Sequence, residues 1–203
     1  MSEIIKLDNI DLSSVVEGLK KGKTVVYPTE TCYGLGCDAS NQDSVDKVFK
    51  IKQRQLDKPL LMIVPDEKMA MEYIEWNEKI AGLCQKYLPG PLTIVARAIE
   101  GRGLAKGVLA EDGTAAFRII DHPFASELTD KFGKPLVSTS ANISSHESPY
   151  SMESVVEMFE NQEYQPDIII DAGELLSKNL STVVKVEDGR IEVLRQGGLV
   201  VEV

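Results

Sequence analysis

The sequence predicts an α/β (α+β) protein in which helices pack on a twisted mixed sheet. Short apolar runs alternate with segments of helical periodicity along most of the 203 residues, which is the pattern of a sheet covered by helices. Near the C-terminus, two further runs flank Asp188-Gly189, a two-residue type I′ hairpin signal. No linker rich in Pro, Gly or Ser divides the chain. We therefore expect a single domain over residues 1–203, with two small domains as the less favoured alternative.

In the first third of the chain, strands are expected to alternate with helices. Asp11 can cap a helix that stops at Gly22, because the apolar residues between them recur at helical spacing. Pro28 ends the buried strand that precedes it. Strands are expected at residues 3–7, 24–27, 33–39 and 60–64, and a second helix at about residues 42–52.

Prolines and glycines mark the elements in the rest of the chain. Two helical stretches follow residue 64, and Pro89-Gly-Pro91 ends the second because neither proline can continue a helix. Pro123 and Gly133 frame another helix, and one more is expected at about residues 152–160. Strands are expected at residues 92–98, 114–120, 136–139, 168–171, 182–186 and 191–194, with a mobile loop at 101–113 and a polar loop at 140–151.

The composition argues against several classes of protein. A formal net charge of -10 disfavours a general attraction to nucleic acid. No basic N-terminal stretch leads into an apolar run, and no apolar run approaches the roughly 20 residues of a membrane-spanning helix, so a cytoplasmic location without membrane contact is expected. Three cysteines without a C-x-x-C pair and two separate histidines predict neither a disulfide framework nor a zinc site. Cys32 is interpreted as a small buried hydrophobe.

A basic cluster contrasts with this acidic background. Lys50-Ile-Lys-Gln-Arg-Gln-Leu-Asp-Lys58 holds four cations within nine residues, which predicts either a local anion site or a solvated helix end. In a continuous helix Lys50 and Arg54 would share a face, and Lys52 would point nearly opposite. If the helix ends near Lys52, an extended segment would place Lys52 and Arg54 on the same side. Arg54 could then grip a phosphate or carboxylate with two parallel hydrogen bonds.

Two polar segments follow predicted strands. Pro28-Thr-Glu-Thr-Cys-Tyr-Gly-Leu-Gly36 places hydroxyls and glycines at a strand end, which suits either close approach of the backbone to a ligand or a tight polar turn with glycines at positive φ. Ser138-Thr-Ser-Ala-Asn142 could form an anion or sugar site, although such residues are also common in plain turns. Each segment by itself leaves both interpretations open.

Two arginines outside the basic cluster are candidates for binding. Arg118 lies in a mostly apolar predicted strand and shares a face with Ala116 and Ile120, so it either lines a site or faces solvent. Arg195 precedes Gln-Gly-Gly198, where the backbone is flexible. The sequence contains no Ser-His-Asp order, Walker A loop or G-x-G-x-x-G. We therefore expect cations and hydroxyls to position ligands, without a covalent nucleophile.

Four motifs in register resemble the YrdC family of threonylcarbamoyl-AMP synthases, in its short single-domain type. These motifs are Pro28-Thr-Glu-Thr-Cys-Tyr-Gly-Leu-Gly36, Lys52-Gln-Arg54, Pro89-Gly-Pro-Leu92 and Ser138-Thr-Ser-Ala-Asn142. The resemblance implies a YrdC-like fold, with a twisted mixed sheet around a concave cationic cavity. It also implies a reaction in which L-threonine, bicarbonate or CO2, and ATP with Mg²⁺ give threonylcarbamoyl-AMP and pyrophosphate. Proteins that modify an adenosine of certain tRNAs would use the product, with at most weak contact between tRNA and this chain.

Residues that match family positions are expected to share the roles known there. Arg118 matches the arginine that binds the carboxylate of L-threonine. Lys52 and Arg54 match the K-x-R pair near the nucleotide phosphates and are the residues expected to act in catalysis. The other expected contacts to L-threonine are Thr31, Ser138 and Ser181, and the other expected contacts to the nucleotide are Lys58, Thr114, Ser140, Asn142, Ser148 and Arg195.

At two places the sequence departs from the pattern of many family members. Lys58 stands where those members have Asn, and Ile63 stands where they have a His that touches the threonine. Lys58 could strengthen phosphate binding through its charge. The missing His leaves the basis of amino-acid selection open.

Two other functions are consistent with parts of the pattern. One is a non-catalytic module that binds tRNA or double-stranded RNA, against which a pI of about 4.8 argues. The other is a related carbamoyl-adenylate-forming enzyme of hydrogenase maturation. Such a domain normally sits in a longer chain with zinc-binding cysteine pairs, and this sequence has no such pairs.

Overall fold

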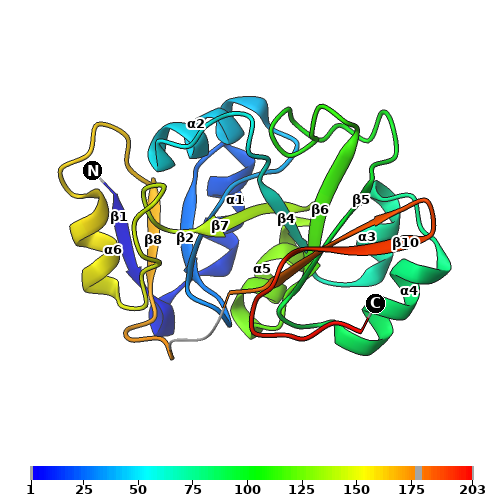
Figure 1. Ribbon diagram of the computed structural model, residues 1–203. Coiled ribbons are helices and arrows are strands. Elements are labelled where there is room, and N and C mark those ends of the chain that lie inside the picture. Colours follow the sequence, from blue (N-terminus) through cyan, green and yellow to red (C-terminus); the bar gives the residue numbers. More distant parts are fainter. Residues whose placement is uncertain (1, 177–179, 203) are drawn as a thin grey trace.

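The computed structural model describes residues 2–176 and 180–202, and within these ranges ten strands form one mixed sheet (Figure 1). The strand order is β1-β8-β2-β3-β7-β4-β6-β5-β9-β10, and both parallel and antiparallel neighbours occur. The predicted α/β architecture is confirmed. The strands are β1 (Glu3–Lys6), β2 (Val25–Pro28), β3 (Tyr33–Gly36), β4 (Leu61–Val64), β5 (Leu92–Arg97), β6 (Thr114–Ile119), β7 (Leu136–Ser140), β8 (Ile168–Asp171), β9 (Thr182–Glu187) and β10 (Arg190–Arg195).

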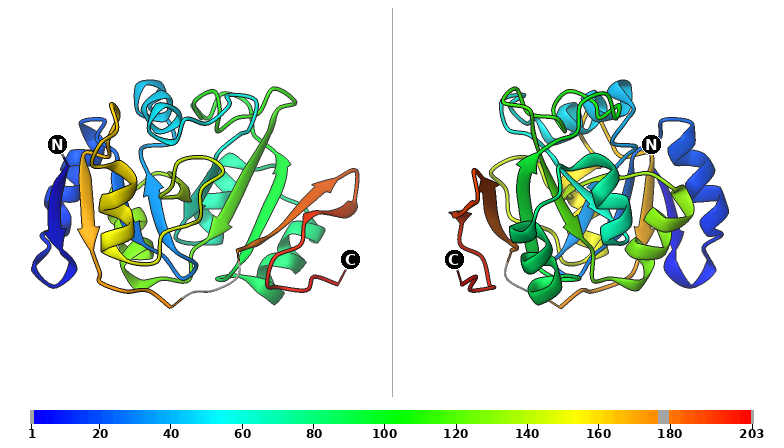
Figure 2. Two further views of the ribbon diagram at one scale, coloured as in Figure 1. Left: turned by 60° about the vertical axis from the view of Figure 1, so that its left-hand side comes forward. Right: turned by 90° about the vertical axis from the view of Figure 1, so that its right-hand side faces the viewer.

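Helices cover the sheet through two separate clusters of buried apolar side chains. One cluster joins α1 and α5 to the sheet, and the other joins α2, α3, α4 and α6 to it. In the right-hand view of Figure 2, α1 and the β9–β10 hairpin lie on opposite sides of the molecule. The helices are α1 (Leu12–Lys20), α2 (Gln42–Lys52), α3 (Glu67–Tyr73), α4 (Glu78–Tyr87), α5 (Pro123–Phe132) and α6 (Met152–Phe159), with a short 3-10 helix at Leu7–Asn9. Among the described residues, none of these helices combines the length and the apolar character that crossing a membrane requires.

Local signals in the sequence set the ends of these elements. Asp11 caps α1, with its side chain accepting a hydrogen bond from the backbone N of Ser13 at 3.0 Å. Gly133, with φ at 75°, ends α5 in the left-handed conformation that glycine favours. Asp188 and Gly189 both have positive φ, at 50° and 71°, as a type I′ hairpin requires.

The segment at residues 101–113 differs from the mobile loop that its glycines suggested. Ala105 and Val108 are buried in the larger apolar cluster. The backbone N of Ala105 donates to the carbonyl of Ala39 at 2.9 Å, and the N of Leu60 donates to the carbonyl of Gly107 at 2.6 Å. These contacts hold the middle of the segment against the connection between β3 and α2 and against the residue before β4. A loop with buried apolar side chains is part of the core.

Candidate functional site

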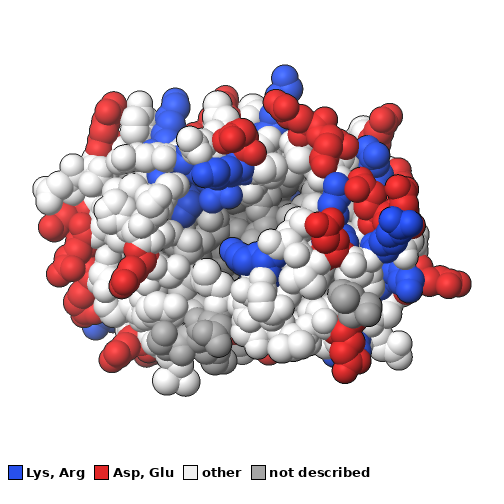
Figure 3. Space-filling view, in the orientation of Figure 1, with Lys and Arg blue, Asp and Glu red and all other residues white. Residues whose placement is uncertain are grey.

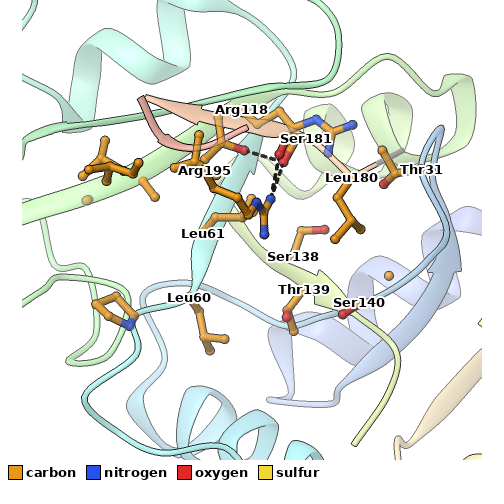
Figure 4. A pocket seen from close by; sticks show the side chains of 18 of the residues that line it. Thr31, Leu60, Leu61, Arg118, Ser138, Thr139, Ser140, Leu180, Ser181 and Arg195 are labelled. Carbon is orange, nitrogen blue, oxygen red and sulfur yellow. Dashed lines mark hydrogen bonds between the residues drawn. The ribbon is translucent and has the colours of Figure 1, made fainter. Parts of the chain in front are cut away.

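A pocket of about 430 Å³ opens in the face of the molecule that Figure 3 shows, near its centre. Lys and Arg side chains lie at the edge of this hollow, and acidic side chains are more common toward the periphery (Figure 3). Side chains from six strands and their connections form its wall (Figure 4). The polar lining residues are Thr29, Thr31, Cys32, Arg54, Thr93, Thr114, Arg118, Ser138, Thr139, Ser140, Ser181 and Arg195.

Strand alternation directs the central lining residues into the pocket. On β6, Thr114, Ala116 and Arg118 are two residues apart, and all three line the cavity. On β7, Leu136 packs in the apolar cluster beneath α1 and α5, whereas Ser138 and Ser140 line the pocket. One strand face therefore changes from core to binding surface within five residues.

The charge of the lining is opposite to the charge of the chain. Three arginines line the pocket and no Asp or Glu does so among the described residues, although the formal net charge is -10. Burial lowers the pKa of Arg54 and Arg195, and the nearby charge of Arg118 contributes to this effect at Arg195. An anion that entered would receive several charge-assisted hydrogen bonds in a partly desolvated place.

Arg54 reaches the pocket because α2 ends early. Gln53 adopts a left-handed conformation with φ at 48° and terminates the helix at Lys52. Of the two alternatives for the basic cluster, the chain therefore takes the early helix exit. The guanidinium of Arg54 donates to the carbonyl of Lys58 at 2.9 Å and to the carbonyl of Pro59 at 3.2 Å. Neutral acceptors therefore fix its orientation, and the charge of Asp57 acts on it without forming an ion pair.

Arg118 lines the pocket and does not face solvent, which decides between the two interpretations of its strand. Its side chain is 6% exposed and forms an ion pair with Glu30, whose side chain is 9% exposed. The Nε of Arg118 donates to the carbonyl of Gly90 at 3.0 Å. Gly90 belongs to the Pro89-Gly-Pro91 turn, so that motif helps to orient the arginine.

Arg195 and Ser181 form a second polar centre in the wall (Figure 4). The Nη2 of Arg195 donates to the backbone O of Ser181 at 2.8 Å and to its Oγ at 3.1 Å. Thr93 lies 3.1 Å from the same hydroxyl. The ladder between β9 and β10 shifts register between Val193 and Arg195, and such a bulge changes the direction of the side chains next to it.

The segment from Pro28 to Gly36 combines a ligand-facing turn with close packing of strands. Thr29 and Thr31 line the pocket, and their hydroxyls are 3.0 Å apart. Neither Gly34 nor Gly36 has a positive φ, so turn conformation does not explain these glycines. A Cβ on Gly36 would lie 2.4 Å from the carbonyl O of Val137, so this glycine allows the close approach to β7. Gly34, in contrast, lines the pocket, where its backbone can approach a ligand.

The structure does not place Lys52 where a phosphate ligand was expected. Its side chain is 2% exposed and does not line the pocket. Its ammonium donates to the carbonyls of Ser140 at 2.5 Å and Asn142 at 2.8 Å, and to Asn142 Oδ1 at 3.1 Å. These three bonds use all the donors of an ammonium group. Burial, with the charge of Arg54, lowers the pKa of Lys52 to about 7.

Three further expected contacts also lie outside the lining. Lys58 is exposed, and its carbonyl, not its ammonium, contacts Arg54. Asn142 is buried, with its side chain bound to Lys52, Ser140 and the carbonyl of His146. Ser148 lines a neighbouring hollow of about 720 Å³. Of the twelve residues expected from the sequence, eight line the pocket: Thr31, Arg54, Thr114, Arg118, Ser138, Ser140, Ser181 and Arg195.

Glu30 and Thr93 are the main features that the sequence analysis did not assign. Glu30 lies between two lining threonines, and the rule that a buried arginine needs a partner would have made it a candidate. Thr93 carried no signal, because it follows a strand pattern like any other residue of its segment. Cys32 lines the pocket, but burial raises the pKa of its thiol, while hydrogen bonds with Ser148 and Thr31 act in the opposite direction. A raised pKa fits the interpretation of Cys32 as an unreactive buried residue.

Ile63, at the position where many family members have a His, belongs to the apolar cluster beneath α1 and α5 and is 1% exposed. It pairs with Arg118 across β4 and β6, but it does not line the pocket. Its neighbour Leu61 does line the pocket. In this chain the side chain at position 63 therefore belongs to the core and does not shape the pocket wall beside Arg118.

Comparisons with known proteins agree with this architecture. A family model, Sua5/YciO/YrdC, which is described as telomere recombination, matches residues 17–197. The threonylcarbamoyl-AMP synthase of Vibrio vulnificus is 34% identical over 192 residues, which cover 92% of this chain and 98% of that protein.

Two solved structures share the fold over nearly the whole chain. Pyrococcus abyssi Sua5 complexed with L-threonine superposes with a TM-score of 0.86 at 30% identity, over 98% of this chain and 58% of that one. The chain thus spans less than two thirds of the Pyrococcus protein. Escherichia coli YciO superposes with a TM-score of 0.83 at 25% identity, over 98% of this chain and 97% of that one.

Proposed function

The chain belongs to the Sua5/YciO/YrdC family, and on this basis we propose that it is a threonylcarbamoyl-AMP synthase. The observation that carries the proposal is the pocket lined by three arginines and by no described carboxylate, within a chain of net charge -10. Such a pocket suits a small polyanion together with a carboxylate. A similarly sized relative bears the name of this activity, and a relative of the same fold was solved with L-threonine.

In the proposed reaction, the amine of L-threonine adds to CO2 and loses a proton to give a carbamate. A carbamate oxygen then attacks the α-phosphorus of ATP, and the bond to pyrophosphate breaks. This transfer of an adenylyl group makes the enzyme a nucleotidyltransferase. Nucleophile and phosphate are both anionic, so the pocket must align them and neutralise their charge.

Each lining residue has a role in this scheme. Arg118 binds the carboxylate of threonine. Arg54 and Arg195, whose guanidinium groups form no ion pair with a described residue, bind phosphates. Thr31, Ser138 and Ser181 provide hydroxyl contacts to the amino acid. Thr114 and Ser140 contact the nucleotide. The other four expected residues act only indirectly in this proposal, since they do not line the pocket: Lys52, Lys58, Asn142 and Ser148.

Mg²⁺ would enter with ATP and would be held by the substrate. No Asp or Glu of the described residues lines the pocket, and residues 2–176 and 180–202 contain no group of three or more His, Cys, Asp or Glu that could hold a metal. The residues therefore do not fit a protein-bound metal centre. Phosphate oxygens and water are ligands that Mg²⁺ commonly keeps in nucleotide sites.

The test is pyrophosphate release from protein, ATP with Mg²⁺, bicarbonate and each amino acid in turn. Release with threonine, and with no other amino acid, supports the synthase.

Arg54→Ala should lower kcat/KM for ATP by roughly tenfold or more, because a charge-assisted hydrogen bond contributes about 1.5–3 kcal/mol. Arg102→Ala is the matched control, since Arg102 is exposed and lies outside the pocket. An unchanged rate in the Arg54 variant would remove Arg54 from the site. No release with any amino acid, together with salt-sensitive RNA binding, would favour an RNA-binding module.

The proposal also implies that other proteins use the product. A mixed anhydride of a carbamate and AMP is a reactive acyl donor, and separate tRNA-modification proteins would transfer its threonylcarbamoyl group to adenosine. Contact between tRNA and this acidic chain should be weak and should decrease with salt. We propose a cytoplasmic location, which fractionation of cells would test.

A further inference from the structure

The three pocket arginines differ in how their charge is compensated. Arg118 is paired with the carboxylate of Glu30, and both side chains are more than nine-tenths buried. Arg54 and Arg195 donate hydrogen bonds to neutral groups only, namely the carbonyls of Lys58 and Pro59, and the backbone and hydroxyl of Ser181. Burial lowers the pKa of Arg54, and the charge of Asp57 opposes this effect by a smaller amount. Within the described ranges no Asp or Glu forms an ion pair with either of them. The pocket thus has one arginine that is compensated by an ion pair, and two that are uncompensated in the sense that they form no ion pair.

The pairing of Glu30 with Arg118 uses only part of each group. Glu30 Oε1 accepts from Arg118 Nη2 and lies 3.3 Å from the backbone N of Asp121. Its second oxygen, Oε2, is buried and has no hydrogen-bond partner among the described residues. On the arginine, Nε is bound to the carbonyl of Gly90 at 3.0 Å. A fully bidentate pair would occupy two donors of the guanidinium with two carboxylate oxygens. Here one carboxylate oxygen binds Nη2 alone, and Nη1 of Arg118 has no hydrogen-bond partner among the described residues.

The different surroundings of the three arginines favour different anions. A polyanion is attracted most strongly to uncompensated cations in a low-dielectric site, which here are Arg54 and Arg195. The negative charge of Glu30 opposes a second polyanion at Arg118. A single carboxylate carries less charge than a phosphate chain, and it can accept hydrogen bonds from the Nη1 side of the planar guanidinium.

We propose that Glu30 determines specificity at Arg118: it screens this arginine from phosphates and thereby reserves it for the carboxylate of the amino acid. The identity of that carboxylate as threonine rests on the proposed function, whereas the screening of phosphate does not. Glu30 acts through Arg118 and is a positioning residue, because it does not line the pocket itself.

The experiment measures binding of inorganic pyrophosphate by calorimetry in the full chain, without nucleotide. Glu30→Gln keeps the shape of the side chain and removes its charge. We expect the affinity for pyrophosphate to rise roughly tenfold, as removal of one nearby charge in a partly buried site allows. We also expect L-threonine to compete with pyrophosphate in the variant but not in the wild-type protein. Glu127→Gln is the matched control, since Glu127 loses the same charge from an exposed pair with Lys131 on α5.

Glu30→Asp is the second variant, in case removal of the charge prevents folding. It retains the carboxylate on a shorter side chain and should give a smaller gain in affinity. No gain in any folded Glu30 variant would overturn the inference, as would an equal gain in Glu127→Gln, because that result would reflect net charge alone. If no amino acid supports pyrophosphate release but Glu30→Gln still binds pyrophosphate more tightly, the screening by Glu30 stands and the synthase proposal fails.

Discussion

Replacing Gly36 with alanine tests whether this motif glycine is required by the packing of β3 against β7. The new Cβ would lie 2.4 Å from the carbonyl O of Val137, and 2.9 Å and 3.1 Å from atoms of the Tyr27 ring and its hydroxyl. Both Val137 and Tyr27 are 0% exposed, so neither can move into solvent. The closest atom belongs to the backbone, and we therefore expect a loss of about 3 kcal/mol, at the upper end of overpacking costs.

Urea unfolding followed by the fluorescence of Trp76 would measure this loss. The chain has one Trp, and its ring lies 6.1 Å from that of Phe117 on β6, so its signal reports on the sheet. Thermal unfolding should shift downward by roughly 6–12 °C. Because β7 carries Ser138 and Ser140 into the pocket, pyrophosphate release should also decrease at temperatures where the variant is folded.

Gly82→Ala is the matched control for Gly36→Ala. Gly82 lies within α4, and a Cβ there would meet nothing within 4 Å. Alanine in that helix should stabilise the protein by up to about 1 kcal/mol. A Gly36→Ala protein within 1 kcal/mol of the wild type, by the same urea measurement, would refute the packing argument.

Three other substitutions give outcomes that the structure determines. Lys52→Met should change how stability depends on pH: burial lowers the pKa of Lys52 to about 7 from 10.5, so the unfolded chain holds the extra proton between these values. The wild type should therefore gain stability relative to the variant by up to about 1.4 kcal/mol per pH unit above pH 7. Urea titrations at a series of pH values would contradict this if the unfolding free energies of the two proteins changed with pH in parallel. Asp167→Asn should cost about 2 kcal/mol at pH 7, because hydrogen bonds from Lys47 and Thr24 outweigh burial and lower the pKa of Asp167. The stability that this lowered pKa contributes is present above pH 3.8, the pKa of Asp167 in the unfolded chain, and is lost as pH falls through the folded pKa. A difference in stability between wild type and variant that persists in acid would therefore contradict the prediction. Ser181→Ala removes a hydroxyl partner of Arg195 and Thr93 and should raise KM for the amino acid several-fold with little change in kcat; a lower kcat at unchanged KM would place Ser181 in the transition state instead.

Much of the fold could be predicted because its signals are local. Asp11, Pro123, Gly133 and Asp188-Gly189 each fix a helix end or a turn through the backbone geometry that the residue prefers. The segment at 101–113 was misjudged for the opposite reason. Its glycines suggest mobility, but Ala105 and Val108 are held by residues far away in the sequence, which no local pattern reveals.

The candidate site, like the fold, was predicted only where residue types and motifs carry the signal. A resemblance in four motifs predicted eight residues that the fold brings into one pocket. It did not predict that Lys52 binds the carbonyls of the segment at 140–142, since a buried ammonium and a phosphate-binding ammonium have the same sequence signature. Nor did it assign Glu30, whose partner Arg118 is 88 residues away.

By itself, the sequence determined the succession of strands and helices, the acidic surface and the residue types available for binding, because these depend on composition and short-range preference. Only the tertiary structure decided which cations face the pocket. It also decided that Lys52 is buried and bound to backbone carbonyls, and that Arg118 is compensated by the carboxylate of Glu30. Those outcomes depend on distances between side chains remote in the sequence, and an electrostatic interaction is set by distance and burial.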